Sequence, residues 1–194
     1  GIMGNGIAAA NVRRGIPVTM TDTNADALAA GGREILSEGS YNKRTKEKDI
    51  QRALDFGPLV DLSEELSDCT SADLVIEAIV ERADVKQPVL KQLDAGLPPS
   101  AILASNTSTI PISQLASDLE HPERFCGIHF FNPVRRMKLV EVIRGEKTSD
   151  QAVVTAVAHV KRLGKLPVVV NDGPGFLVNR LLLPYMHEAV LLVQ

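Results

Sequence analysis

Short apolar runs alternate along the chain with longer segments in which apolar residues recur at helical spacing. Residues 73–80 read DLVIEAIV, a nearly unbroken apolar run of the length expected for a parallel strand that helices cover on both faces. The next segment carries apolar residues at helical spacing from Val85 to Leu93, and its Pro88 is compatible with a helix only near the first turn. This part of the chain therefore predicts a buried strand followed by a helix.

The same pattern gives the remaining elements. We expect further strands at residues 17–22, 59–62, 101–105, 125–130, 138–143 and 167–170. We expect helices from the glycine-rich start to about residue 14, over residues 25–37 and 150–163, and after the Gly-Pro-Gly turn at residues 173–175. The charged segment at residues 38–58 is interpreted as a solvated helical excursion. Strands that alternate with helices in this way are typical of a Rossmann-type, doubly wound α/β fold with a mostly parallel sheet.

Chain length and the last residues predict the domain organisation. The 194 residues exceed a domain of roughly 150 residues by a remainder. We assign residues 1–172 to the Rossmann-type domain and residues 173–194 to the start of a C-terminal all-helical domain. The reason is the run LLLPYMHEAVLLV, which is apolar on most sides and must be covered by a second domain or by an interface.

Composition excludes several classes of protein. Hydrophobic residues make up 44% and charged residues 23%, as in a globular protein, and a net charge of −3 provides no field for nucleic acid. The two cysteines, Cys69 and Cys126, are far apart and indicate neither a disulfide scaffold nor a zinc site. No apolar run approaches the roughly 20 residues that cross a bilayer, and no signal pattern opens the chain. We expect a cytoplasmic protein without a membrane span.

The first residues, GIMGNG, contain part of a dinucleotide-binding turn. Gly1 and Gly4 supply the second and third glycines of the fingerprint, and Asp22 ends the next strand, where an acid binds the ribose hydroxyls. No arginine follows Asp22 to receive a 2′-phosphate, which favours NAD over NADP. The alternative is that these are ordinary turn glycines and that Asp22 only caps a helix. The first glycine and its strand would lie upstream of residue 1, so we expect the chain to be a piece of a longer protein.

Four stretches between residues 105 and 180 read SNTST at 105–109, HFFNPV at 129–134, KLVEV at 138–142 and PGFLVNR at 174–180. In their order and spacing, these stretches resemble 3-hydroxyacyl-CoA dehydrogenases. The amino-acid sequence at residues 135–147 is most similar to the dehydrogenase part of the bacterial multifunctional fatty-acid oxidation complex alpha subunit. The resemblance implies NAD-dependent oxidation of L-3-hydroxyacyl-CoA to 3-ketoacyl-CoA in fatty-acid β-oxidation. It also implies a dimer, or a hetero-oligomer with a thiolase subunit, in the full-length protein.

The resemblance assigns roles to individual residues. His129 matches the family's catalytic histidine and Glu141 the glutamate that orients it. Ser108 matches the serine at the substrate hydroxyl and Asn179 the asparagine at the substrate carbonyl. The matching cofactor-binding positions are Gly1, Met3, Gly4, Asp22, Val80, Glu81, Arg82, Lys86, Ser108 and Asn132. The residues that bind coenzyme A in relatives lie in the excursion that reads YNKRTKEKD here.

The chemistry of the constellation suits this reaction. Oxidation of a secondary alcohol needs a base for the hydroxyl proton, and histidine has an ordinary pKa close to neutral pH. If the strands of His129 and Glu141 pair, the carboxylate can reach one ring nitrogen and leave the other to the substrate. Each residue also has a plain structural interpretation, such as a buried histidine or a serine-rich turn. Two further hypotheses are a non-catalytic NAD-binding or assembly module and a dehydrogenase of free 3-hydroxy acids. No histidine or cysteine has partners at the spacing of a metal site.

Overall fold

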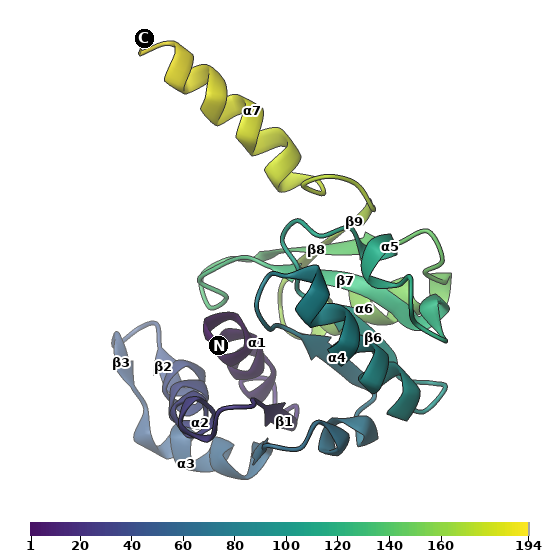
Figure 1. The fold of residues 1–194 in the computed structure, drawn as a ribbon. Helices are drawn as coiled ribbons and strands as arrows, with labels where there is room; N and C mark the ends of the chain where they lie inside the picture. The colour runs from purple at the N-terminus through teal and green to yellow at the C-terminus, as the bar shows by residue number, and fades with distance from the viewer. Residues whose placement is uncertain (194) are drawn as a thin grey trace.

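Helices and strands alternate in the structure, a computed structural model that describes residues 1–193 (Figure 1). The helices are α1 (Ile2–Val12), α2 (Ala25–Ser40), α3 (Ile50–Phe56), α4 (Ala83–Gly96), α5 (Ile112–Leu115), α6 (Asp150–Arg162) and α7 (Val178–Leu191). The strands are β1 (Val18–Thr21), β2 (Tyr41–Asn42), β3 (Glu47–Lys48), β4 (Val60–Ser63), β5 (Leu74–Glu77), β6 (Ile102–Ser105), β7 (Phe125–Phe130), β8 (Leu139–Arg144) and β9 (Leu166–Asn171). The predicted doubly wound α/β fold is confirmed.

The central sheet has five strands in the order β5-β6-β7-β8-β9. Strands β5, β6 and β7 run parallel, so their carboxyl ends lie at one edge, while β8 returns antiparallel to β7. Strands β1 and β4 form a separate parallel pair. Strands β2 and β3 form a small antiparallel pair, so the described strands make three sheets. Ligand sites are expected at the carboxyl edge of the largest one.

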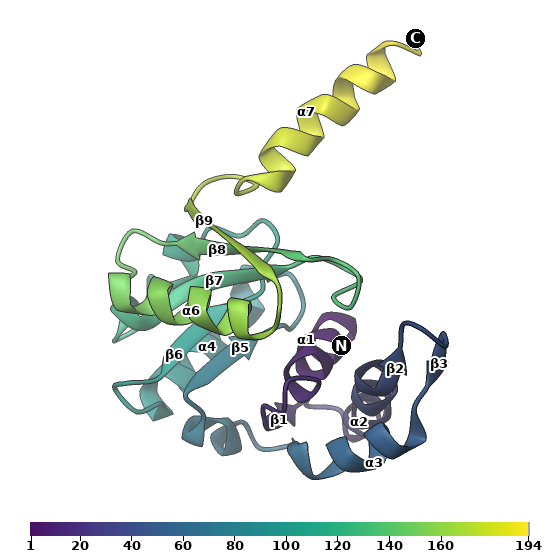
Figure 2. The ribbon, with the colours of Figure 1, turned by 180° about the vertical axis from the view of Figure 1, so that it is seen from behind.

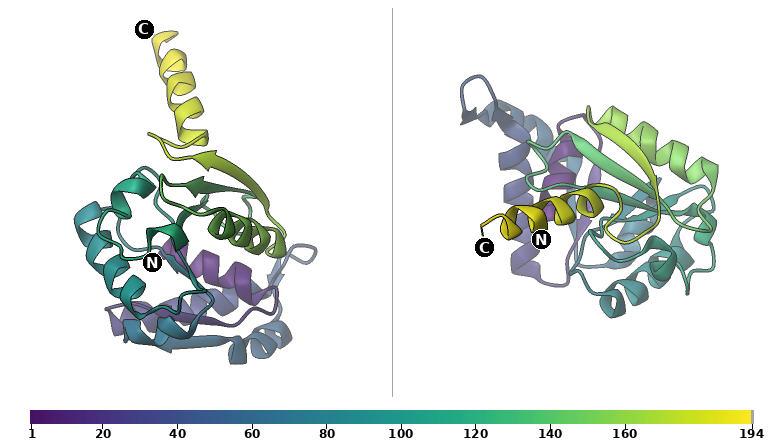
Figure 3. Two further views of the ribbon diagram at one scale, coloured as in Figure 1. Left: turned by 90° about the vertical axis from the view of Figure 1, so that its right-hand side faces the viewer. Right: turned by 90° about the horizontal axis from the view of Figure 1, so that it is seen from above.

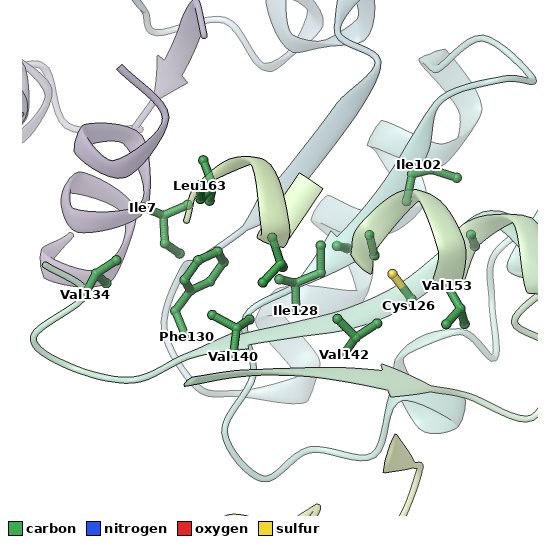
Figure 4. Close-up of a cluster of buried hydrophobic side chains, with 14 residues drawn as sticks. Ile7, Ile102, Cys126, Ile128, Phe130, Val134, Val140, Val142, Val153 and Leu163 are labelled. Carbon is green, nitrogen blue, oxygen red and sulfur yellow. The ribbon is translucent and has the colours of Figure 1, made fainter. Parts of the chain in front are cut away.

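Helices cover both faces of the five-stranded sheet. On one face, α6 packs its apolar side on β7 and β8, and residues such as Val153 of α6 and Val142 of β8 belong to one buried cluster (Figure 4). Figure 2 shows α6 over this face. On the other face, α4 and α5 bury Leu90 and Leu115 against β6. The strands are apolar on both sides for this reason.

Helix α1 connects the five-stranded sheet with the pair of β1 and β4. Its Ile7 belongs to the cluster under α6, whereas Ala8 and Val12 pack with β1 and α2. A Cβ atom at Gly6 would lie only 2.9 Å from the Cγ2 atom of Val134, so glycine permits the close approach of α1 to the loop between β7 and β8. This contact fixes the amino end of α1 beside the carboxyl edge of the sheet.

The charged segment after α2 differs from the prediction. Tyr41–Asn42 and Glu47–Lys48 form a β-hairpin, so the solvated helix predicted for this run is wrong over residues 41–48. It is confirmed over α3, a helix that has no buried residue. The turn is closed by the Asn42 side chain, which accepts a hydrogen bond from the Arg44 amide, and by Lys46 with a φ of 61°. Pro88 also lies deeper in its helix than expected, at the sixth residue of α4.

Helix α7 projects away from the rest of the chain (Figure 1 and Figure 3). It has no buried residue, and large apolar side chains such as Leu181 and Tyr185 are 66% and 74% exposed. Among residues 1–193, no helix combines the length and the apolar character needed to span a bilayer. The division at residue 172 into a Rossmann-type domain and the start of a helical domain stays a prediction.

Candidate active site

The carboxyl edge of the sheet gathers the predicted site residues. His129 lies near the end of β7, Ser105 is the last residue of β6, and the loop that carries Ser108 follows it. Because β8 returns antiparallel to β7, Glu141 lies directly opposite His129 in the register. The expected pairing of these two strands is thus present.

The side chains of His129 and Glu141 form a buried pair. The Nδ1 atom of His129 lies 2.7 Å from Oε2 of Glu141, and the two residues are 5% and 0% exposed. The rings of Phe131 and Phe176 flank the imidazole, with centroids 4.4 Å and 5.9 Å away. Within residues 1–193, the Nε2 atom of His129 makes no hydrogen bond, so this nitrogen is left for a ligand. A carboxylate that accepts from Nδ1 favours the tautomer in which Nε2 can take up a proton.

The second oxygen of Glu141 holds the start of the last helix. Its Oε1 atom accepts hydrogen bonds from the backbone amides of Leu177 and Val178, at 2.9 Å and 2.8 Å. Asn179, in the first turn of α7, donates from Nδ2 to the backbone oxygen of Ser108 over 3.2 Å. The structure therefore links His129, Glu141, Asn179 and Ser108 into one connected group. The backbone bonds of Glu141 were not predicted from the sequence.

Glu81 holds the loop that carries Ser108. Its Oε1 atom accepts from the Thr107 hydroxyl at 2.7 Å and from the backbone amides of Ser108 and Thr109 at 2.6 Å and 3.1 Å. Partial burial acts to raise the pKa of Glu81, but these hydrogen bonds and the charge of Lys86 outweigh it and hold the pKa below its ordinary value. Glu81 is accordingly an ionised clamp on this loop.

Lys86 joins Glu81 to a carboxylate that the sequence analysis missed. Its Nζ atom lies 2.7 Å from Oε1 of Glu77 and 3.4 Å from Oε2 of Glu81. Glu77 also accepts from the Ser105 hydroxyl at 2.6 Å and from the Ile79 amide at 2.7 Å. Glu77 and Lys86 are 4% and 1% exposed. The available signal was an acidic residue inside an otherwise apolar strand, which requires a buried partner.

The predicted dinucleotide residues lie around the amino end of α1. Gly1 is the N-cap of this helix and provides no side-chain cap, so the first amides of α1 are free to bind an anion. A carboxylate oxygen of Asp22 lies 3.6 Å from the Gly1 nitrogen. A Cβ atom at Gly4 would stand 4.0 Å from the Cβ atom of Ala78, which shows how closely α1 approaches the end of β5. Free helix amides beside an acidic side chain fit the pyrophosphate and ribose of a dinucleotide.

The remaining predicted residues are more peripheral. Arg82 is bound to Asp84 through Nε at 3.1 Å, and both side chains are exposed. Val80 is 59% exposed, and Asn132 lies exposed in the loop after β7. In the part of the chain that the structure describes, no group of three or more His, Cys, Asp or Glu side chains is arranged to hold a metal ion.

Comparison with known proteins points to one family. A family model described as 3-hydroxyacyl-CoA dehydrogenase, NAD binding domain, matches residues 1–173. The chain is 49% identical over 190 residues to the fatty acid oxidation complex subunit alpha of Idiomarina loihiensis, covering 96% of this chain but only 26% of that relative. The crystal structure of (S)-3-hydroxybutyryl-CoA dehydrogenase PaaH1 from Ralstonia eutropha is 40% identical, with a TM-score of 0.92 over 97% of this chain and 67% of that one. FadB2 of M. tuberculosis is 35% identical and also has a TM-score of 0.92, over 100% of this chain and 68% of its own.

Proposed function

Because the chain belongs to the 3-hydroxyacyl-CoA dehydrogenase family and contains its NAD-binding domain, we propose that it supplies the base and the cofactor site for oxidation of L-3-hydroxyacyl-CoA to 3-ketoacyl-CoA. The observation that carries the proposal is the 2.7 Å pair of His129 and Glu141 at the carboxyl edge of the sheet. We place the reaction in fatty-acid β-oxidation, because the Idiomarina relative is named for a fatty acid oxidation complex.

His129 acts as the general base. Its Nε2 atom takes the proton of the substrate hydroxyl while the carbon–oxygen bond becomes a carbonyl. Glu141 fixes the ring through Nδ1 and stabilises the imidazolium that forms. NAD⁺, when bound, accepts the hydride that leaves the same carbon. Two electrons and one proton leave with the hydride, and the second proton remains on His129.

Ser108 and Asn179 position the substrate. The Ser108 hydroxyl makes no hydrogen bond within residues 1–193, so it is available to the hydroxyl of the substrate. Asn179 is already oriented by its hydrogen bond to the Ser108 backbone oxygen, which holds its side chain beside Ser108. It donates to the substrate carbonyl once that bond is exchanged.

The free amino end of α1 and Asp22 hold the dinucleotide. Gly1, Met3 and Gly4 form the turn at the pyrophosphate, and Asp22 binds the ribose hydroxyls. Glu81, Lys86 and Asn132 lie toward the nicotinamide ribose, with Val80 and Arg82 beside them. The absence of an arginine directly after Asp22 favours NAD over NADP.

Two further proposals concern the whole protein. We place it in the cytoplasm, and we propose that it assembles as a dimer or as a hetero-oligomer with a thiolase subunit. The exposed apolar side chains of α7 support a covering partner or domain. The chain spans 26% of the length of its Idiomarina relative. The location and the assembly are therefore proposed for the whole protein that contains this domain.

The test is turnover of acetoacetyl-CoA with NADH, followed as loss of absorbance at 340 nm. The proposal expects turnover by the full-length protein, and we expect the activity of these 194 residues alone to be weak or absent. It also expects acetoacetate as a free acid to react far more slowly. Cofactor binding with a flat signal would instead identify a non-catalytic NAD-binding module. Equal rates for the acid and its thioester would identify a dehydrogenase of free 3-hydroxy acids.

A further inference from the structure

A cleft of about 270 Å³ between α1 and the loop joining β7 to β8 is lined mainly by cations. We call it the basic cleft. Its charged lining residues are the cations Arg13, Arg14, Lys43, Arg135, Arg136, Lys138 and Lys165 and the single carboxylate Glu38. Six positive charges are therefore in excess, in a chain whose net charge is −3.

Three of the cations are fixed by neutral backbone oxygens. Arg14 donates to Leu163 at 3.2 Å and Arg13 to Tyr41 at 3.1 Å. Lys165 donates to the carbonyls of Val134 and Met137 at 2.6 Å and 2.8 Å. These bonds hold the cations in place without neutralising them.

Within the described residues 1–193, one cation of the basic cleft is paired with an acid. Arg135 lies 2.8 Å from Glu38 and stacks on the Tyr41 ring, 4.0 Å from its centroid. Among residues 1–193, the side chains of Arg136, Lys138 and Lys43 take part in no hydrogen bond or ion pair. The free cations thus face the cleft without an internal counter-charge.

Mutual repulsion is visible in two of the fixed cations. Burial, followed by the charges of Arg52, Arg135 and Arg14, lowers the pKa of Arg13. Burial and then the charge of Lys43 lower the pKa of Lys165. An anion in the basic cleft would relieve this repulsion.

We propose that the basic cleft binds the phosphates of a phosphorylated nucleotide. Guanidinium groups suit phosphate because their planar donors contact two oxygens at once. The cluster is confined to one concavity, which fits several phosphates on a small molecule better than a nucleic acid backbone. Its α1 residues begin at Gly6, more than one turn beyond the amino end that suits the dinucleotide, so the two sites are separate.

Two sources share this chemistry. One is the phosphoadenosine end of acyl-CoA, an assignment that rests on the proposed function; the loop that lines the cleft begins directly after β7, which carries His129. The other is a free nucleotide that binds as an effector. Both predict that phosphates are bound by the same free cations.

The test removes free cations that hold nothing else. The double variant R136A/K138A is compared with K91A/K147A, which removes two exposed lysines that do not line the basic cleft. Calorimetry measures the binding of adenosine 3′,5′-bisphosphate in saturating NAD⁺, with inorganic phosphate as a second probe. We expect R136A/K138A to weaken binding of the bisphosphate by about tenfold or more, because two charge-assisted contacts to phosphate are lost. The control variant should bind normally.

Kinetics then separates the two sources. If the substrate is the ligand, R136A/K138A raises KM for acetoacetyl-CoA but not for acetoacetyl-pantetheine, which lacks the nucleotide. If an effector is the ligand, bisphosphate binding weakens and both KM values stay unchanged. Equal bisphosphate affinity in wild type, variant and control overturns the basic cleft as a phosphate site. The calorimetric arm needs no turnover, so its result stands even if the proposed dehydrogenase activity fails.

Discussion

Glu141 uses one oxygen for His129 and the other for the backbone of Leu177 and Val178. The same buried carboxylate therefore orients the imidazole and fixes the start of α7. Because Asn179 follows within that first turn and bonds to Ser108, the base and the substrate-positioning residues depend on one side chain. Because the residues are coupled, conservative substitutions are needed to separate the contribution of each one.

Replacing His129 with glutamine removes the proposed base and keeps a similar side-chain volume. We expect kcat to fall by roughly 10²- to 10⁴-fold, the usual contribution of a general base, while NAD⁺ affinity stays unchanged. Turnover is followed at 340 nm and cofactor binding by fluorescence titration. The matched control is His121→Gln, at an exposed histidine paired with Glu123, which should retain activity. Wild-type turnover in the His129 variant would remove this residue from the mechanism.

Replacing Glu141 with glutamine tests the orientation of the ring. The amide oxygen can still accept from Leu177 and Val178, so the melting temperature should change little. The amide NH₂ group would donate to Nδ1 of His129, which leaves the proton on Nε2 and blocks that nitrogen as a base. We expect kcat to fall roughly 10³-fold or more through the wrong tautomer. A variant that unfolds at much lower temperature but keeps its kcat when folded would contradict a positioning role for Glu141.

The pair of His129 and Glu141 was predictable because it depends only on the pairing of two neighbouring strands. His129 and Glu141 lie on consecutive strands, so an antiparallel pairing alone brings them opposite each other. The backbone bonds from Leu177 and Val178 were not predictable, because they depend on where the loop after β9 passes. Glu77 was missed for a different reason. The run that contains Glu77 indicates an apolar strand and gives no sign of a charged partner, although that partner, Lys86, is itself assigned to the cofactor site.

The fold was predictable wherever apolar periodicity is strong. Strands β6 and β7 and helix α6 lie within a residue or so of their predicted bounds. The hairpin of β2 and β3 was not predicted, since its residues are mostly charged and show no alternation. Its position depends on tertiary contacts such as Tyr41 beneath Arg135. The basic cleft could not be predicted from the sequence either, because it combines α1 with loops more than a hundred residues away along the chain.

Cys126 gives a prediction of alkaline stability. Its side chain is fully buried in β7, and burial raises the pKa of the thiol from 9.0 to about 12. In the unfolded chain the thiol ionises near pH 9, so the folded state loses stability as pH rises from about 9 toward 12. The loss approaches about 4 kcal/mol at the upper end of this range.

Urea unfolding of wild type and Cys126→Ala at pH 7 and pH 10.5 measures this effect. At pH 7 the alanine variant should be less stable by about 1–2 kcal/mol, because it loses buried volume. At pH 10.5 the difference should shrink by about 2 kcal/mol, because only the wild type has the thiol to ionise. Cys69→Ala is the control, since burial also raises the pKa of that thiol but is less complete. A difference that stays constant with pH would contradict the burial effect.

Glu77 provides a test of the cofactor side of the site. Replacing it with glutamine leaves the buried ammonium of Lys86 with Glu81 as its remaining carboxylate partner. We expect Lys86 to draw Glu81 away from the amides of the Ser108 loop. The KM for NAD⁺ should then rise by roughly tenfold, with a smaller change in kcat at saturating cofactor, and stability should fall by about 3–5 kcal/mol.

A comparable ion pair elsewhere separates this role from general destabilisation. Asp94 lies in the last turn of α4 and Arg124 directly precedes β7; both are buried, with Nη2 of the arginine 2.9 Å from the carboxylate. Asp94→Asn should cost similar stability without changing the KM for NAD⁺. The double variant E77Q/K86M should recover stability, because no buried charge is left unpaired. Its KM for NAD⁺ should still be raised, because it lacks the Lys86 side chain that we assign to the cofactor site. If Glu77→Gln and Asp94→Asn raise the KM equally, Glu77 acts on stability alone and has no positioning role.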